Sequence, residues 1–310
     1  MLLVACGPAA TATPTPRQPI TITDDMGRTV KVMPNPQRLA SLAPSITEIL
    51  FALDINEEIV GITSFCDYPE AALSKPKIGG FVNPSIEKIV SLKPDLVIGI
   101  GEGNRRETIY RLGNLGLSVY CVNPKGFDGV MRTIQNIGEI VGRQDESEKI
   151  IRNMFNKMKH IVILTKPLPR PRVFFQVGFD PIVTVGRRTL GNDLIRLAGG
   201  RSISENESVI YPLYSMEIIL LKAPEIIIIS SMGSKKNYLN LAKKWQNWKS
   251  IPAVKMNAIH VVDSNLVDRP TPRIIEGLEE LTKIIHPETL KKDSYRGRRL
   301  KLTLDTYERL

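Results

Sequence analysis

The chain contains one type of segment twice, and this duplication restricts its possible folds more than any other feature. Residues Ser85–Ile98 and Ser215–Ile228 both predict a short helix, then a Lys, a Pro and an acidic residue, then a buried apolar strand. Such a repeat indicates two similar lobes rather than one continuous sheet. Strands also alternate with helical segments throughout each half, which predicts parallel sheets covered on both faces. We therefore expect an α/β protein with two lobes.

A long helical segment separates the two halves. The apolar residues of Glu146–Leu164 recur at spacings of three and four, which is typical of one buried helical face. At 1.5 Å per residue, about 20 residues extend about 30 Å, enough to connect two lobes. The sequence thus predicts two Rossmann-like lobes with parallel sheets, residues 20–143 and 166–290, joined by one long helix of residues 144–165.

The N-terminus indicates where the protein resides. Met1-Leu-Leu-Val-Ala-Cys6 resembles the end of a bacterial lipoprotein signal peptide, in which the cysteine is lipidated. The following stretch is rich in Ala, Thr and Pro, a composition suited to a tether. We interpret residues 1–19 as a signal remnant and tether, and we expect an extracytoplasmic protein, either membrane-anchored through Cys6 or periplasmic. The alternative is a short apolar N-terminus with an incidental cysteine.

The net charge of +10 is unevenly distributed along the chain. The basic tail of residues 291–310 holds seven Lys/Arg and three Asp/Glu, so it contributes +4, and +6 is spread over the other 290 residues. No basic stripe or aromatic-basic motif accompanies it, so we predict no nucleic-acid partner. No apolar run approaches the ~20 residues that span a bilayer.

The sequence offers little for catalysis or metal binding. Three Cys and three His occur without Cys-x-x-Cys or His-x-x-x-His spacing, so no metal site is predicted. Gly99-Ile-Gly101-Glu-Gly103 lacks the full dinucleotide fingerprint, and no nucleophile elbow or P-loop is present. We therefore predict a protein that is not an enzyme and has no cofactor. Cys66 and Cys121 are compatible with either a disulfide or two free thiols.

The first lobe has a clear helix-start pattern. Pro44–Leu53 is predicted to be helical, with Ser45 as its N-cap and Glu48, three residues later, as the capping-box partner.

Four stretches, in order along the chain, resemble a known family: Ser41–Glu48, Ser64–Pro69, Ile86–Asp95 and Arg269–Ile275. They are similar to the helical-backbone class (class III) of bacterial substrate-binding lipoproteins, which serve ABC importers of cobalamin, haem and ferric siderophores. The resemblance implies a monomeric receptor that holds a metal chelate between its lobes. It also implies delivery of that chelate to a permease dimer with its cytoplasmic ATPase.

Within this class, Asp67-Tyr68-Pro69 and Pro272–Ile275 look most like the cobalamin-binding members. The resemblance places large aromatic residues against the corrin at Phe65, Phe81 and Tyr211, and a polar anchor at Arg269. A corrin has an apolar face and amide edges, so it needs aromatic walls and a few neutral polar groups. The residues that could address the amides are Tyr68, Asn83 and Asn265.

The sequence departs from that pattern at several positions. Ile100 and Val183 stand where an aromatic is expected, and Asn265 stands where an acid is expected. A haem receptor is one alternative, with Tyr68, Tyr211 or Tyr214 offered to iron. A ferric-siderophore receptor is another, with Arg187, Arg188 and Arg269 as its cations. An enzyme on an α/β scaffold is a distant third.

The duplicated segments each carry a glutamate at an equivalent place, Glu87 and Glu217. The resemblance implies that these two carboxylates dock onto arginines of the permease. The alternative is that both are ordinary acids at helix starts, where the helix dipole favours negative charge.

Overall fold

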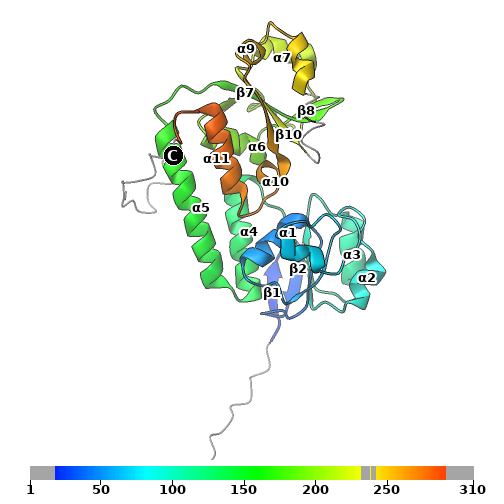
Figure 1. Ribbon diagram of the computed structural model, residues 1–310. Coiled ribbons are helices and arrows are strands. Elements are labelled where there is room, and N and C mark those ends of the chain that lie inside the picture. Colours follow the sequence, from blue (N-terminus) through cyan, green and yellow to red (C-terminus); the bar gives the residue numbers. More distant parts are fainter. Residues whose placement is uncertain (1–17, 232–237, 239–241, 291–310) are drawn as a thin grey trace, which may run out of the picture.

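The structure is a computed structural model that describes residues 18–231, 238 and 242–290. It shows two α/β lobes, with the long helices α4 (Gly126–Val141) and α5 (Gln144–Thr165) beside them (Figure 1). The predicted lipidation site Cys6, most of the tether and the basic tail lie outside the described residues. No described helix is long and apolar enough to span a bilayer.

The N-terminal lobe is built on a parallel sheet of strand order β4-β3-β5-β6. A hairpin precedes it, and helices cover it. The strands are β1 (Ile20–Thr23), β2 (Thr29–Val32), β3 (Leu39–Ser41), β4 (Ile59–Ile62), β5 (Leu96–Ile100) and β6 (Val119–Val122). The helices are α1 (Pro44–Ala52), η1 (Glu70–Ser74), α2 (Ile86–Ser91) and α3 (Arg106–Asn114).

The C-terminal lobe repeats this plan with the order β11-β10-β7-β8, and β9 also pairs with β7. Only β8 pairs antiparallel in this sheet. The strands are β7 (Arg172–Phe179), β8 (Ile182–Thr184), β9 (Arg201–Ser202), β10 (Ile226–Ser231) and β11 (Ile259–Asp263). The helices are α6 (Leu190–Leu197), α7 (Met216–Lys222), η2 (Lys244–Asn247), α9 (Pro252–Lys255), α10 (Ser264–Val267) and α11 (Ile274–Ile285). Strand β10 begins with four isoleucines and is buried throughout, as expected for a central parallel strand.

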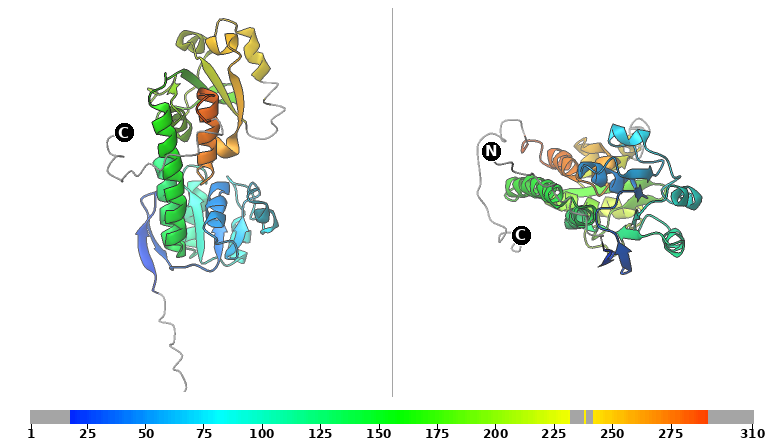
Figure 2. Two further views of the ribbon diagram at one scale, coloured as in Figure 1. Left: turned by 60° about the vertical axis from the view of Figure 1, so that its left-hand side comes forward. Right: turned by 90° about the horizontal axis from the view of Figure 1, so that it is seen from below.

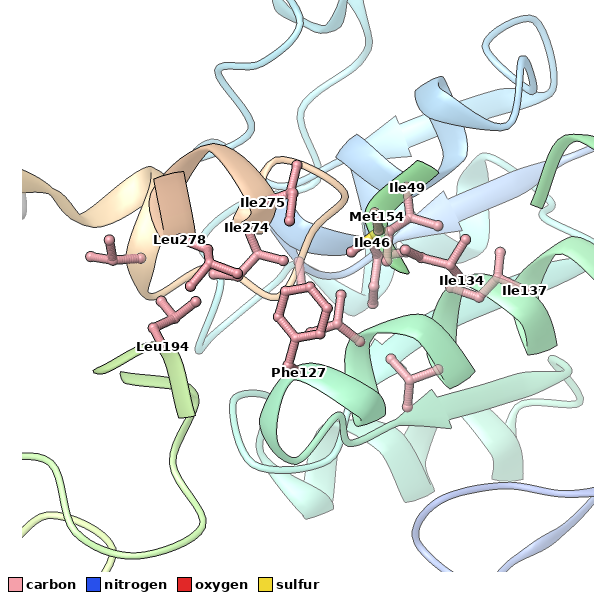
Figure 3. Packing of buried hydrophobic residues seen from close by; sticks show 14 of the residues in the cluster. Ile46, Ile49, Phe127, Ile134, Ile137, Met154, Leu194, Ile274, Ile275 and Leu278 are labelled. Carbon is pink, nitrogen blue, oxygen red and sulfur yellow. The ribbon is translucent and has the colours of Figure 1, made fainter. Parts of the chain in front are cut away.

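One apolar core runs through both lobes. Helix α5 extends along both of them (Figure 2). The core includes Ile46 of α1, Phe127 of α4, Met154 of α5, Leu194 of α6 and Leu278 of α11, most of which Figure 3 shows in one cluster. Two domains of one chain usually move relative to each other unless the interface between them is large and hydrophobic. Here the interface between the lobes is part of one continuous apolar core. The lobes therefore form a firmly joined pair.

Helix α1 begins at Pro44 as predicted, but its predicted N-cap and capping box are wrong. Ala43 is the N-cap and makes no side-chain capping bond, and Pro44 occupies the first turn. Proline suits that position because its φ is already helical and its missing N–H would have had no partner there. Ser45 lies inside the helix, and Glu48 bonds to the other lobe instead of to the helix start.

The two duplicated segments do fold alike. The hydroxyl of Ser85 accepts a hydrogen bond from the Lys88 N–H at 3.2 Å, and the Ser215 hydroxyl accepts one from the Ile218 N–H at 3.5 Å. Both serines are therefore N-caps, at α2 and α7.

The N-terminus of α4 is capped from the other lobe. Asp193 of α6 accepts a hydrogen bond from the Phe127 N–H at 3.1 Å. Gly126, with φ +63°, leaves room for this carboxylate, because a side chain there would collide with Asp193. A negative charge stabilises the positive end of a helix dipole. The first turn of α4 thus depends on a residue of the C-terminal lobe.

Candidate ligand-binding cleft

A cavity of about 1290 Å³ lies between the lobes. It is lined by residues at or just after the carboxyl ends of strands from both sheets: Ser64 after β4, Glu102 after β5, Asn123 after β6, Ser231 of β10 and Asp263 of β11. Open α/β sheets bind ligands at this edge. The duplication therefore presents two such edges to a single cleft.

Aromatic rings enter the cleft from both lobes. Phe65 of the N-terminal lobe is 61% exposed, and Tyr211 of the C-terminal lobe is 57% exposed. Phe81 also lines the cleft, but it packs partly against the core. Gly103 makes this packing possible, since a side chain at that position would collide with the Phe81 ring. Exposed rings in a concave surface are typical of a binding site.

A buried asparagine that the sequence analysis missed holds this aromatic wall in place. The amide nitrogen of Asn104 donates to the carbonyls of Leu42 and Phe81 at 3.0 and 2.9 Å. Its side-chain oxygen accepts from the Ile100 N–H at 2.7 Å. Asn104 thus ties the ends of two strands to the Phe81 loop. The available signal was a polar residue directly after the glycine-rich turn that follows β5.

The C-terminal lobe contributes an acidic wall. Asp268 faces the cleft and accepts a hydrogen bond from the Ser230 hydroxyl. Desolvation of its carboxylate by the surrounding protein raises the pKa of Asp268 to about 6. The hydrogen bond from Ser230 opposes this shift, and the nearby charge of Asp263 adds to it. Partial enclosure of the phenol by the cleft, with the charges of Asp268 and Glu102, raises the pKa of Tyr211. Asp268 was not among the site residues predicted from the sequence.

Arg269 lines the cleft, but acids of the other lobe hold its guanidinium. It donates to Asp67 at 2.7 Å and to Glu48 at 3.0 Å. Arg273 also binds Glu48, at 2.9 and 3.1 Å, and stacks over the Tyr68 ring with 3.6 Å to its centroid. The Glu48 side chain is only 2% exposed. We call these five residues the interlobe joint, since they connect the lobes beside the cleft.

The remaining predicted site residues are divided between the cleft and other places. Asn265, Ile100 and Arg188 line the cleft. Residues outside its lining are Tyr68, Asn83, Val183, Arg187 and Tyr214. Tyr214 is buried and donates to Glu207 at 2.9 Å, so it is not positioned to ligate a metal in the cleft.

The two internal cysteines are free and buried. Cys66 lies against the hydroxyls of Thr47 and Thr63 at 3.1 and 3.2 Å, and burial raises the pKa of Cys121 to about 12. Of the two possibilities left open by the sequence, free thiols are the one observed. Across the described ranges, no group of three or more His, Cys, Asp or Glu could hold a metal ion.

Glu87 and Glu217 are fully exposed at the starts of α2 and α7. Hydrogen bonds from nearby backbone N–H groups and from the Ser85 hydroxyl lower the pKa of Glu87, and bonds from Ser215 and the backbone lower that of Glu217. Both carboxylates are therefore charged at neutral pH. Within the described part of the chain, neither forms an ion pair.

Comparison with known proteins identifies the family. A family described as "Periplasmic binding protein" matches residues 39–266. The chain is 31% identical to the uncharacterized ABC transporter substrate-binding lipoprotein YvrC of Bacillus subtilis (strain 168), over 88% of each chain. It resembles the crystal structure of the periplasmic vitamin B12 binding protein BtuF of Vibrio cholerae (TM-score 0.73, 26% identity, 81% of this chain and 97% of that one). It also resembles the periplasmic heme-binding protein RhuT from Roseiflexus sp. RS-1 (TM-score 0.73, 25% identity, 81% and 98%). The chain belongs to the periplasmic binding protein family and is an extracytoplasmic substrate-binding component of an ABC importer, not an enzyme.

Proposed function

We propose that this receptor captures a corrinoid of the cobalamin type in the interlobe cleft and delivers it to a permease dimer with its ATPase. The observation that carries the proposal is a cavity of about 1290 Å³ with a ring from each lobe and acids on one wall. Pockets for drug-sized ligands occupy roughly 300–1,000 Å³, so this cleft suits a larger ligand. The resemblance to BtuF, a vitamin B12 binding protein, supports the same ligand class.

The charges of the cleft favour amide edges over carboxylate edges. Asp263 and Asp268 can accept hydrogen bonds from amide N–H groups but would repel an anionic chelate. Among the described residues, three cations line the cleft: Arg269 is held by acids of the N-terminal lobe and Lys125 by Glu102, which leaves Arg188 as the one lining cation without an ion pair. This pattern favours a corrinoid over the anionic chelates that many siderophores form.

Haem is the second candidate, because the chain resembles the heme-binding protein RhuT and because Tyr211 lines the cleft. Tyrosine ligates ferric iron as a phenolate. The raised pKa of Tyr211 disfavours that form, and the acidic wall disfavours the haem propionates. Both observations favour a corrinoid over haem.

Titration of the purified protein with cyanocobalamin, cobinamide, haemin and a ferric hydroxamate siderophore tests the proposal. We expect a Kd for the corrinoids on the order of 10 nM to 1 μM, or about −8 to −11 kcal/mol. No calorimetric saturation with either corrinoid at tens of micromolar, beside clear saturation by haemin, would reject the corrinoid.

We also propose that Glu87 and Glu217 dock the loaded receptor onto permease arginines, and that lipidated Cys6 anchors the monomeric receptor to the membrane. The two carboxylates lie on rigid elements of different lobes, α2 and α7 (Figure 1), which suits a partner made of two equivalent subunits. The double variant Glu87→Ala/Glu217→Ala should keep ligand affinity and thermal stability but lose uptake. Normal uptake would instead identify both as ordinary helix-start acids.

A further inference from the structure

Helices α2 and α7, which carry the two proposed docking glutamates, both begin with a serine N-cap followed by that glutamate. Their solvent-facing sides differ. In α2, Glu87 is followed by Lys88 and, three residues after that, by Ser91, all exposed. The equivalent residues of α7 are Ile218 and Leu221, and both are exposed. We call Glu87, Lys88 and Ser91 the α2 patch, and Glu217, Ile218 and Leu221 the α7 patch.

The α7 patch forms one face of its helix. Residues three and four apart are neighbours on a helix surface, so Leu221 lies next to both Ile218 and Glu217. Leu221 is 86% exposed and Ile218 is 38% exposed. The fold leaves Leu221 largely uncovered and Ile218 partly uncovered, because the helix packs on its lobe through the buried Ile219.

The charge of α7 is also distributed differently from that of α2. The Lys222 amine lies over the ring of Tyr214, 5.8 Å from its centroid, so it is directed toward the lobe. The outer face of α7 thus shows a carboxylate beside Ile218 and the largely exposed Leu221, whereas α2 shows a carboxylate beside an ammonium group, a hydroxyl group and one valine, Val90, that is 39% exposed.

We infer that the receptor docks asymmetrically: the α7 patch makes a combined ionic and apolar contact with one permease subunit, and the α2 patch makes a polar contact with the other. The inference rests on the proposed docking function. The contact surface that fits the α7 patch is an arginine bordered by apolar side chains. Because burial of an exposed leucine side chain stabilises a contact, the C-terminal lobe supplies the larger share of docking affinity.

Other occupants fit the α7 patch less well. A membrane surface attracts helices that carry lysines or arginines beside their apolar residues, and here the neighbour is Glu217. A second copy paired through this patch would bring two Glu217 carboxylates together, and like charges at an interface repel.

An exchange of the two patches tests the inference. The variant Ile218→Lys/Leu221→Ser gives α7 the residues of α2, and Lys88→Ile/Ser91→Leu does the reverse. Binding is measured to the cognate permease–ATPase complex in lipid nanodiscs. We expect the first variant to weaken docking about 10- to 100-fold, since truncated central contacts commonly cost more than 1 kcal/mol each. The reverse exchange should weaken docking less than the first variant, because the α2 patch keeps Glu87 and loses no large apolar contact. Ligand affinity and melting temperature should not change in either variant.

Three results would overturn the inference. Docking unaffected by the α7 exchange, while Glu87→Ala/Glu217→Ala abolishes it, rejects the apolar contact and leaves the proposed docking intact. Docking unaffected by both the exchange and the glutamate variants rejects the docking proposal itself. Leu221-dependent self-association in sedimentation, or Leu221-dependent binding to vesicles of anionic phospholipid, assigns the patch to another occupant.

Discussion

The two lobes share one plan of strands and helices but bring different chemistry to the cleft. The N-terminal lobe contributes two rings, Phe65 and Phe81, and two ion-paired acids, Asp67 and Glu102. The C-terminal lobe contributes one ring, Tyr211, and the acids Asp263 and Asp268. In both lobes these residues follow or end strands, so the duplicated scaffold sets their position. The loops set their identity, as is usual for function built on a repeated fold. A duplicated scaffold can therefore surround one ligand with two unlike walls.

The largest loss of stability is expected from a variant that breaks the interlobe joint, which connects the two lobes beside the cleft. Glu48→Ala removes a buried acid and leaves Arg269 and Arg273 without their shared partner. Breaking a buried ion pair in this way costs about 3–5 kcal/mol. We expect the free energy of unfolding in urea to fall by that amount.

The matched control is Glu205→Ala, whose partner Arg201 lies at 2.8 Å in an exposed pair. Such a pair contributes at most about 1 kcal/mol. Equal losses in the two variants would show that the joint does not hold the lobes together.

The second-largest effect is expected on ligand affinity, when an aromatic ring of the cleft lining is removed. Phe65→Ala should weaken cyanocobalamin binding about 10- to 100-fold, because it removes a ring of the cleft lining that we propose stacks on the ligand face. The control is Leu73→Ala, an exposed apolar residue of η1 outside the cleft lining. Isothermal titration calorimetry measures both. A Phe65 variant that binds as tightly as the Leu73 variant would remove Phe65 from the site.

The smallest effect concerns the acidic wall and depends on pH. The pKa of Asp268 is raised from 3.8 to about 6, so between these values the folded protein binds more protons than the unfolded chain. Stability therefore falls as pH rises through this window, and the loss is complete above about pH 6. Asp268→Asn should be more stable than the parent at pH 7.5, by at most about 1 kcal/mol because solvent in the cleft screens the charge. The gain should disappear near pH 4.

Thermal melts of the ligand-free proteins at these two pH values measure the difference. The variant Ser230→Ala sharpens the test: it removes a hydrogen bond that lowers the pKa of Asp268, so the pH window should move upward. An equal difference between parent and Asp268→Asn at both pH values would contradict the raised pKa.

Most of the fold could be predicted because its signals are local. Short stretches of sequence were enough to predict three features: the Ser85 and Ser215 caps, the run of isoleucines in β10 and the periodicity of α5. The capping box at Ser45 was also a local pattern, but it was wrong. Glu48 instead binds arginines more than 200 residues away, and such tertiary contacts override a local preference.

The site was less predictable for the same reason. Phe65, Phe81 and Tyr211 line the cleft as the resemblance implied, although their contact with a ligand stays a prediction. Tyr68 was assigned to the ligand, but the structure places its ring under Arg273. The raised pKa of Asp268 arises from the packing around it, which no stretch of sequence reveals.

The cap on α4 has a consequence for how the molecule opens. Because Asp193 holds the Phe127 N–H from across the lobes, separating the lobes also frays the first turn of α4. We therefore expect separation of the lobes and local unfolding of that turn to occur together, with the same free energy. Hydrogen exchange at the Phe127 amide therefore reports directly on lobe separation, and ligand that holds the lobes together should slow that exchange.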